Sequence, residues 1–341
     1  MHCASVYRDQ MSALRRRVHR RPEEGWTEFE TTALIVNHLR SLQFEVRCGR
    51  AVIHPDFVMG RDPHQVAEAI ARAKRQGVSE ELLSELDGFT GAVGIWDSGR
   101  PGPVTAFRFD IDCVQVGETS DPAHEANAGG YASERPNLMH ACGHDGHTTM
   151  LLAAARYLSQ HRNFRGRVVL VFQPAEEGTG GALAMIKDGL FERFPMDEIY
   201  GMHNWTDVEP GTFSVKSGAA MAGSDFFTIK LHGKGAHGSA PQLSADAALA
   251  ASLVTVALQQ IVARNVAPLD SAVVSVTKIH TGSAFNIIPQ EAELGGCTRF
   301  FSSKTGAMLR RRIEEVAVST AAACGVKAEV EFESIYAVLD N

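Results

Sequence analysis

The densest group of metal-ligating side chains lies at residues 140–147, with the sequence HACGHDGH. One thiol, three imidazoles and one carboxylate fall within these eight residues, and such groups suit zinc, cobalt, nickel or manganese. Cys142 and His144 are two residues apart, so both side chains can reach one ion from an extended or looped segment. A polar loop with satisfied histidines is the alternative, but so many ligand groups together favour a metal site.

Two adjacent carboxylates, Glu176 and Glu177, follow the continuous apolar run VVLVFQ at 168–173. This run is typical of a strand buried on both faces, and ligands of open α/β sheets gather at the carboxyl ends of strands. Ionised neighbours repel each other unless cations are present. Two metal ions would remove that conflict, with one Glu as ligand and the other as proton carrier. A solvated loop is the alternative.

Further candidates follow other predicted strands. His203 lies in MHNW, at the end of the strand predicted at 199–204, and Asp110 and Asp112 follow the strand PVTAFRF. The two aspartates are candidates for metal ligands or for partners that orient a histidine, with an ordinary surface loop as the alternative. No single segment suffices, and the hypothesis depends on three strand ends that meet at one edge of a sheet.

Three residues of the C-terminal half are candidates for substrate binding. His237 lies in a loop between a strand and a helix, and Asn286 lies between two strands. Arg299 lies in an otherwise apolar strand, where its guanidinium needs an anion, and a carboxylate gives the bidentate match. An internal salt bridge is the alternative for Arg299.

The predicted elements divide the chain into two parts. Strands alternate with helices up to about residue 222, which predicts an α/β domain with a mostly parallel central sheet. The order from 223 to 333 is β-α-β-β-α-β, the ferredoxin-like arrangement. Residues 61–87 are charged and are predicted to form an exposed helical excursion. The N-terminal Arg and His cluster is interpreted as a solvated helix face.

Composition excludes several classes of protein. The chain has 341 residues, a net charge of −7 and 44% hydrophobic residues, which predicts about two domains and excludes intrinsic disorder. The mild acidity gives no support for a nucleic-acid partner. We expect no membrane span and no signal peptide, because no apolar stretch of about 18 residues is found. Six scattered cysteines predict a reducing, cytoplasmic location without disulfides.

Five motifs, HACGHDGH, FQPAEEGTGGA, GMHNW, GKGAHGSAP and AFNIIP, resemble those of the M20 metallopeptidases, in particular the branch of amidohydrolases that cleave N-acyl amino acids. The resemblance implies a zinc-peptidase-like catalytic domain at 1–222 and a lid and dimerisation domain at 223–333. Residues 334–341 would begin the return to the catalytic domain, and the rest of that return, with a last ligand histidine, is expected to be missing.

The resemblance also implies a role for each candidate residue. Two divalent metal ions (Zn, Mn, Co or Ni) would be held by Cys142, His144, Glu177 and His203, with the thiolate bridging them. Glu176 would be the general base, and Asp110 and Asp112 would support the ligands. The substrate would be bound by His237, Asn286 and Arg299. A homodimer through the lid domain is implied, with His237 reaching the neighbouring active site; a heteromeric partner subunit is the alternative.

The implied activity is hydrolysis of the amide bond of N-acyl amino acids, such as p-aminobenzoyl-glutamate or hippurate, by a metal-activated water. Two alternatives stay open. One is an aminoacylase or dipeptidase of the same superfamily. The other is a catalytically weak subunit that serves in assembly.

Overall fold

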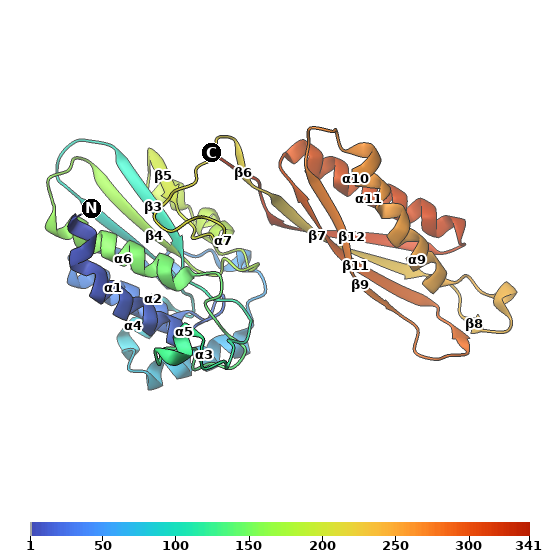
Figure 1. The fold of residues 1–341 in the computed structure, drawn as a ribbon, viewed down its shortest axis with the longest axis horizontal. Coiled ribbons are helices and arrows are strands. Elements are labelled where there is room, and N and C mark those ends of the chain that lie inside the picture. Colours follow the sequence, from blue (N-terminus) through green and yellow to red (C-terminus); the bar gives the residue numbers. More distant parts are fainter. Residues whose placement is uncertain (1) are drawn as a thin grey trace. The chain divides into compact units, whose positions relative to one another are not determined.

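The computed structural model describes residues 2–341, with side chains from residue 7 onward. The chain divides into two compact units, Met1–Asp207 and Val208–Asn341. Each unit combines helices with a β-sheet, so the predicted mixed α/β class is confirmed (Figure 1).

The first unit is built on a five-stranded sheet with the order β1-β2-β4-β3-β5. Its strands are β1 (Glu45–Cys48), β2 (Ala92–Asp97), β3 (Val104–Asp110), β4 (Arg167–Gln173) and β5 (Glu198–Gly201). Its helices are α1 (His2–Arg20), α2 (Phe29–Ser41), α3 (Pro63–Arg75), α4 (Glu80–Leu86), α5 (Glu125–Ala128), α6 (His144–Gln160), α7 (Gly181–Lys187) and α8 (Leu190–Arg193).

The prediction of a mostly parallel sheet is wrong for half of the strand pairs. β3 runs parallel to β4 and to β5, but β1 and β2 pair antiparallel, as do β2 and β4. A parallel connection needs a long crossover, which α6 supplies between β3 and β4. The connection from β2 to β3 is only a short turn, so the chain reverses there, and β4 then lies between the two strands.

β4 contributes to hydrophobic cores on both faces of the sheet. Val168, Leu170 and Phe172 pack with residues of α2, α4 and α6, whereas Val169 and Val171 pack with residues of α7. Six of its seven residues are buried, which confirms the prediction of a strand buried on both faces. Its carboxyl end is thereby held firmly where Glu176 and Glu177 follow.

Two predictions about exposure are wrong. The helices α3 and α4 are not merely an exposed excursion, because one face of each packs into the core through residues such as Ala69 and Leu86. The N-terminal basic cluster is not wholly solvated either. His19 is buried and bonds to Asp145 (2.9 Å) and Glu118 (3.0 Å). Helical periodicity shows which residues share one face of a helix, but not which other segment of the chain packs against that face.

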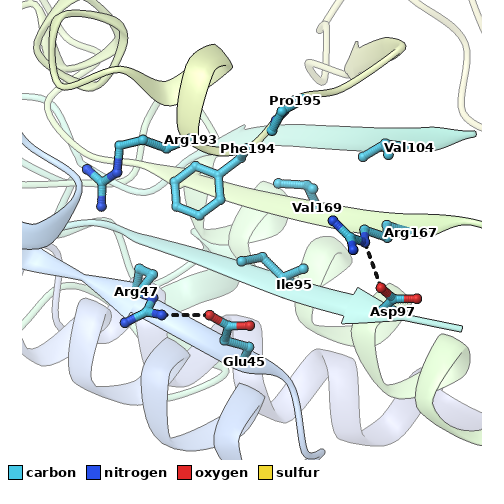
Figure 2. A pocket seen from close by; sticks show the side chains of 10 residues that line it. All are labelled: Glu45, Arg47, Ile95, Asp97, Val104, Arg167, Val169, Arg193, Phe194 and Pro195. Atoms are coloured by element: carbon cyan, nitrogen blue, oxygen red, sulfur yellow. Dashed lines mark hydrogen bonds and ion pairs between the residues drawn. The ribbon is translucent and has the colours of Figure 1, made fainter. Parts of the chain in front are cut away.

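A pocket of about 370 Å³ lies in the first unit, and Figure 2 shows the side chains that line it. Arg47 pairs with Glu45 (2.8 Å) and Arg167 pairs with Asp97 (2.6 Å) in its lining. Val104 and Arg167 begin β3 and β4, so the pocket lies at the amino ends of these strands. The candidate site residues follow their carboxyl ends, at the opposite edge of the sheet.

The second unit contains a four-stranded antiparallel sheet with the order β12-β7-β11-β9. Its main elements follow in β-α-β-β-α-β order: β7 (Gly223–His232), α9 (Ala247–Leu258), α10 (Gln260–Asn265), β9 (Ala272–Thr281), β11 (Glu291–Phe300), α11 (Ser303–Ala323) and β12 (Lys327–Tyr336). Two short ribbons accompany them: β8 (Ala236–His237) with β10 (Ile287–Ile288), and β6 (Ala219–Met221) with β13 (Leu339–Asp340).

One helical stretch, Ala247–Asn265, is long and apolar enough to cross a membrane by length and composition alone. The expectation that no such stretch exists is therefore wrong. The stretch consists of α9 and α10, and Ala250, Val254 and Leu258 are fully buried in the core of the second unit. A core helix of a folded domain meets the same criterion, so this finding is weak evidence for a membrane span.

We expect Arg310→Ala to destabilise the second unit. The buried Asp225 carboxylate (0% exposed) accepts hydrogen bonds of 2.7 and 2.6 Å from Arg310. Removing the cation leaves a buried charge unpaired, which costs about 3 kcal/mol. Urea unfolding would measure this loss, with Arg311→Ala, an exposed arginine on the same helix, as the control. Equal stability of the two variants would contradict the prediction.

Candidate metal centre

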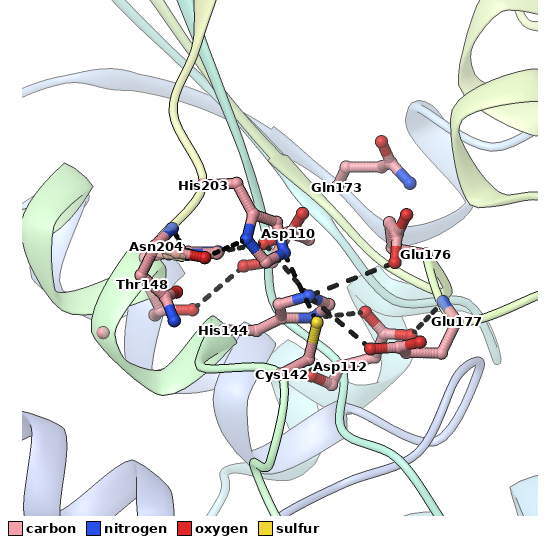
Figure 3. A network of polar contacts seen from close by, with 12 residues as sticks. Asp110, Asp112, Cys142, His144, Thr148, Gln173, Glu176, Glu177, His203 and Asn204 are labelled. Atoms are coloured by element: carbon pink, nitrogen blue, oxygen red, sulfur yellow. Dashed lines mark hydrogen bonds and ion pairs between the residues drawn. The ribbon is translucent and has the colours of Figure 1, made fainter. Parts of the chain in front are cut away.

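Three parallel strands end at one edge of the first unit's sheet, and each is followed by candidate site residues. Asp110 ends β3, Glu176 and Glu177 follow β4, and His203 follows β5. Figure 3 shows these side chains around His144, the first residue of α6. The structure therefore brings together residues that are distant in the sequence, such as Asp110 and His203, which are 93 positions apart.

His144 is oriented by the segment that follows β3. Its Nδ1 lies 2.9 Å from the carbonyl oxygen of Asp112 and 3.2 Å from that residue's Oδ1. Both are acceptors, so Nδ1 is the nitrogen that donates, which leaves Nε2 to bind an ion once its own proton is lost. The other carboxylate oxygen of Asp112 accepts the backbone N–H of Glu177 at 2.9 Å. Asp112 thus holds both the His144 ring and the loop that carries Glu177.

The Nε2 atom of His144 and the Oε1 atom of Glu177 are buried without a hydrogen-bond partner among the described residues. They lie 3.7 Å apart. Cys142 Sγ and His203 Nε2 are 3.3 Å from each other, and Cys142, His144 and His203 each offer an atom within 4.8 Å of the other two. Buried polar atoms rarely stay unpaired, and a thiolate, two imidazoles and a carboxylate are ligands that zinc-like ions take. The residues present therefore fit a divalent metal ion.

The charges at the site also favour a cation. Burial opposes protonation of His144, but its hydrogen bonds and the charges of Asp110 and Asp112 outweigh burial and raise its pKa to about 11. Burial, together with the negative charges of Asp112, Glu177 and Asp110, raises the pKa of Glu176 to about 7. A cluster that holds protons this tightly is short of positive charge, which bound metal would supply.

His147 is a site residue to which sequence reasoning gave no role. Its Nδ1 lies 2.6 Å from Asp110 Oδ1, and its Nε2 accepts the backbone N–H of Asn204 at 3.0 Å. Because both ring nitrogens are used, His147 ties the end of β3 to the segment that carries His203. The sequence contained a sign that His147 belongs to the site, because His144 and His147 are three residues apart and so share one face of a helix.

We expect Gly143→Ala to disturb this centre. Gly143 has φ +93° at the start of α6, and an added Cβ would lie 2.5 Å from the side-chain amide of Asn204. The left-handed conformation alone costs a non-glycine residue about 1–2 kcal/mol. We expect lower stability to urea and weaker metal binding.

Gly146→Ala is the matched control, because an added Cβ at residue 146 meets nothing within 4 Å. Metal titration and urea unfolding of both variants would check the prediction. If Gly143→Ala binds metal as the wild type does, Asn204 does not limit the geometry of the centre.

His237 and Asn286 lie on one short ribbon of the second unit. His237 pairs with Ile287 in the ribbon formed by β8 and β10, and Asn286 accepts the Gly238 N–H at 2.8 Å through its carbonyl oxygen. The backbone N–H of Ser239 donates to His237 Nδ1 at 3.2 Å. That contact places the proton of neutral His237 on Nε2, so the exposed ring can donate a hydrogen bond.

Arg299 lies in β11 of the same unit. Its guanidinium donates to the hydroxyl of Ser224 (2.5 Å) and to the carbonyl oxygen of Thr298 (2.9 Å). No ion pair to a carboxylate is found for it in residues 7–341, where side chains are described. The alternative of an internal salt bridge is therefore not supported, and its charge is available to an anion.

The fold and the donor set define an α/β protein with a candidate centre for divalent metal ions. The family model described as peptidase family M20/M25/M40 matches residues 106–308, more than half of the chain. The chain therefore belongs to the M20 peptidase family and is an enzyme of that family, which confirms the resemblance of its motifs.

Relatives and solved structures agree with this assignment. The chain is 40% identical to a hippurate hydrolase of Campylobacter jejuni, over 90% of this chain and 78% of that one. It is also 40% identical to a p-aminobenzoyl-glutamate hydrolase homolog of Haemophilus influenzae, over 84% and 67% of the two chains. The YXEP protein of Bacillus subtilis, described as a dinuclear metal-binding peptidase from the M20 family, superposes with a TM-score of 0.72 at 29% identity, covering 99% of this chain and 76% of that one.

Proposed function

We propose that the protein hydrolyses the amide bond of N-acyl amino acids with the help of two divalent metal ions. The observation that carries the proposal is a pair of buried ligand atoms, His144 Nε2 and Glu177 Oε1, beside Cys142 and His203. Neither atom has a hydrogen-bond partner in the part of the chain that the structure describes. Relatives named for hippurate and p-aminobenzoyl-glutamate hydrolysis support the substrate class.

We assign ligand roles to Cys142, His144, Glu177 and His203, and the role of general base to Glu176. Metal ions bound there would lower the pKa of water and polarise the substrate carbonyl. Glu176 takes the proton of the attacking water and passes it to the leaving amine. Asp112 holds His144 with Nε2 left for the ion, and Asp110 holds His147, which in turn bonds to the segment that carries His203.

We assign substrate binding to the second unit, as a lid and dimerisation domain. Arg299 and Asn286 hold the carboxylate of the amino acid and thereby fix the position of the scissile bond. His237 donates from Nε2 to the carbonyl oxygen as negative charge develops on it. A homodimer is part of the proposal, because the family resemblance implies that His237 acts in the neighbouring subunit.

A panel of substrates tests the proposal. The protein is incubated in turn with Zn²⁺, Mn²⁺, Co²⁺ and Ni²⁺, and release of the amine is measured with hippurate, p-aminobenzoyl-glutamate and a plain dipeptide. Hydrolysis of the two N-acyl amino acids supports the proposal. Preference for the dipeptide would favour the dipeptidase alternative, and metal binding without any hydrolysis would favour an assembly role.

We expect Arg299→Ala to raise KM for hippurate roughly 10- to 100-fold, because charge-assisted hydrogen bonds contribute about 1.5–3 kcal/mol. The wild type should strongly prefer hippurate over its carboxamide, and the variant should lose that preference. Steady-state kinetics with both compounds checks this, and the exposed Arg311→Ala serves as the control. A variant that still prefers the carboxylate would exclude Arg299 as its partner.

A further inference from the structure

Glu28 is a buried carboxylate that lies against the loop following β4. The residue is 0% exposed. Its Oε1 accepts the backbone N–H of Ala175 at 2.7 Å, and its Oε2 accepts the hydroxyl of Thr90 at 2.7 Å. Ala175 directly precedes Glu176, so Glu28 holds the loop immediately before its two functional carboxylates.

Ala175 has an unusual backbone conformation for a residue with a side chain. Its φ is +52°, in the left-handed region, and it is fully buried. Its carbonyl oxygen accepts from Gly181 N (3.0 Å) and Thr179 Oγ1 (3.2 Å). Such a conformation persists only where the surroundings impose it. A return of Ala175 to the common φ range would rotate the peptide that follows and redirect Glu176.

The ordinary structural roles of a carboxylate do not account for Glu28. It precedes α2, but its side chain makes no capping hydrogen bond to that helix. No cation pairs with it in the part of the chain that the structure describes, unlike the neighbouring buried Glu23, which pairs with Arg72. Among the described residues, the hydrogen bonds of its side chain to other residues go to Ala175 and Thr90.

We infer that Glu28 is a positioning residue that holds Ala175 in its left-handed conformation and so directs Glu176 and Glu177 toward His144. The inference rests on the proposed function for the roles of Glu176 and Glu177. Glu28 itself touches neither substrate nor metal in this scheme, and it acts through the backbone of one loop residue.

The protonation state of Glu28 bears on the choice of variants. Burial and the negative charge of Asp112 raise the pKa of Glu28 well above its ordinary value. In either protonation state the carboxyl can accept the Ala175 N–H through one oxygen and bond to the Thr90 hydroxyl through the other. Glu28→Gln keeps an acceptor and a donor at these positions, whereas Glu28→Ala removes both.

The test has two measurements. Co²⁺ alone is titrated into metal-free protein, and its binding is detected by the absorption of the cobalt–thiolate bond. In addition, kcat and KM are measured for hippurate. For Glu28→Ala we expect Co²⁺ affinity to fall about tenfold and kcat to fall about 10- to 100-fold, the range for groups that orient metal ligands. KM should change little. Glu28→Gln should stay close to the wild type in both measurements.

Two further variants separate positioning from general loss of structure. Ala175→Gly, added to Glu28→Ala, should restore a large part of the loss, because glycine adopts positive φ readily. Glu23→Ala is the control for burial: Glu23 is also 0% exposed and accepts the N–H of Thr31 at 2.8 Å. Among the described residues, no hydrogen bond or ion pair joins Glu23 to the loop. It should lower stability and leave Co²⁺ affinity and kcat unchanged.

Three results would overturn the inference: wild-type Co²⁺ affinity and kcat in Glu28→Ala, no rescue by Ala175→Gly, or an equal loss in Glu23→Ala. If Glu28→Ala does not fold, Glu28→Asp replaces it with the same expectations, since its carboxylate is one methylene short of the Ala175 N–H. If the wild type hydrolyses no N-acyl amino acid, the proposed function fails, and the Co²⁺ titration with its rescue still decides the role of Glu28.

Discussion

Replacing Glu176 by Gln is expected to lower kcat for hippurate about 10²- to 10⁴-fold, the contribution of a positioned general base. The amide cannot take a proton from water at neutral pH, yet it has nearly the same shape as the carboxylate. Bound metal, measured by elemental analysis, should therefore stay at the wild-type amount. Binding of hippurate, measured by calorimetry on the inactive variant, should also be preserved.

Glu177→Gln is the matched control, because it makes the same change one residue along the same loop. In the wild type, the Oε1 atom of Glu177 is buried 3.7 Å from His144 Nε2 and has no hydrogen-bond partner among the described residues. We expect this second variant to lose metal as well as turnover. The two roles would have to be exchanged if Glu176→Gln lost metal and Glu177→Gln kept it. Near-normal turnover by Glu176→Gln would remove the base assignment altogether.

Replacing His144 by Ala is expected to abolish metal binding at the centre. His144 belongs to each of the three overlapping ligand groups found among the described residues, so every arrangement of ions loses a donor. Loss of a group that only orients a ligand costs about 10- to 100-fold in affinity, and loss of a ligand should exceed that. Calorimetric titration of metal-free protein with Zn²⁺ would measure the change.

Thermal unfolding gives a second measure of the same prediction. A ligand at 100 times its Kd stabilises the folded protein by about 2.7 kcal/mol, so Zn²⁺ should raise the melting temperature of the wild type and not that of His144→Ala. His161→Ala, at the other end of α6, is the control and should respond as the wild type does. An unchanged response of His144→Ala to Zn²⁺ would place the metal elsewhere.

Local sequence pattern was enough to predict the elements that position the centre. The apolar run at 168–173 predicted a strand buried on both faces, and β4 confirms this. The carboxyl ends of β3, β4 and β5 meet because parallel strands expose the same end at one edge. The segments of His144, Glu176 and His203 were therefore expected together, with Asp110 as a further candidate. The roles of these residues stay predictions until the variants are measured.

Contacts between distant segments could not be predicted from pattern. Glu28 and Ala175 are 147 residues apart, and His19 and Asp145 are 126 apart, and neither pair has a local signal that names its partner. The antiparallel pairing of β2 with β4 was not predicted for the same reason. A run of apolar residues predicts that a strand is buried, but not which strand will lie beside it.

The insertion of β4 between β2 and β3 also constrains how the first unit folds during its synthesis. β2 and β3 are neighbours in the chain, yet each pairs with residues 167–173 and not with the other. During synthesis from the N-terminus, both strands leave the ribosome before the strand that joins them exists. Until then their backbone groups are open to wrong partners, a state that favours aggregation. Expression at low temperature or with chaperones should therefore increase the yield of this unit more than any change at its surface.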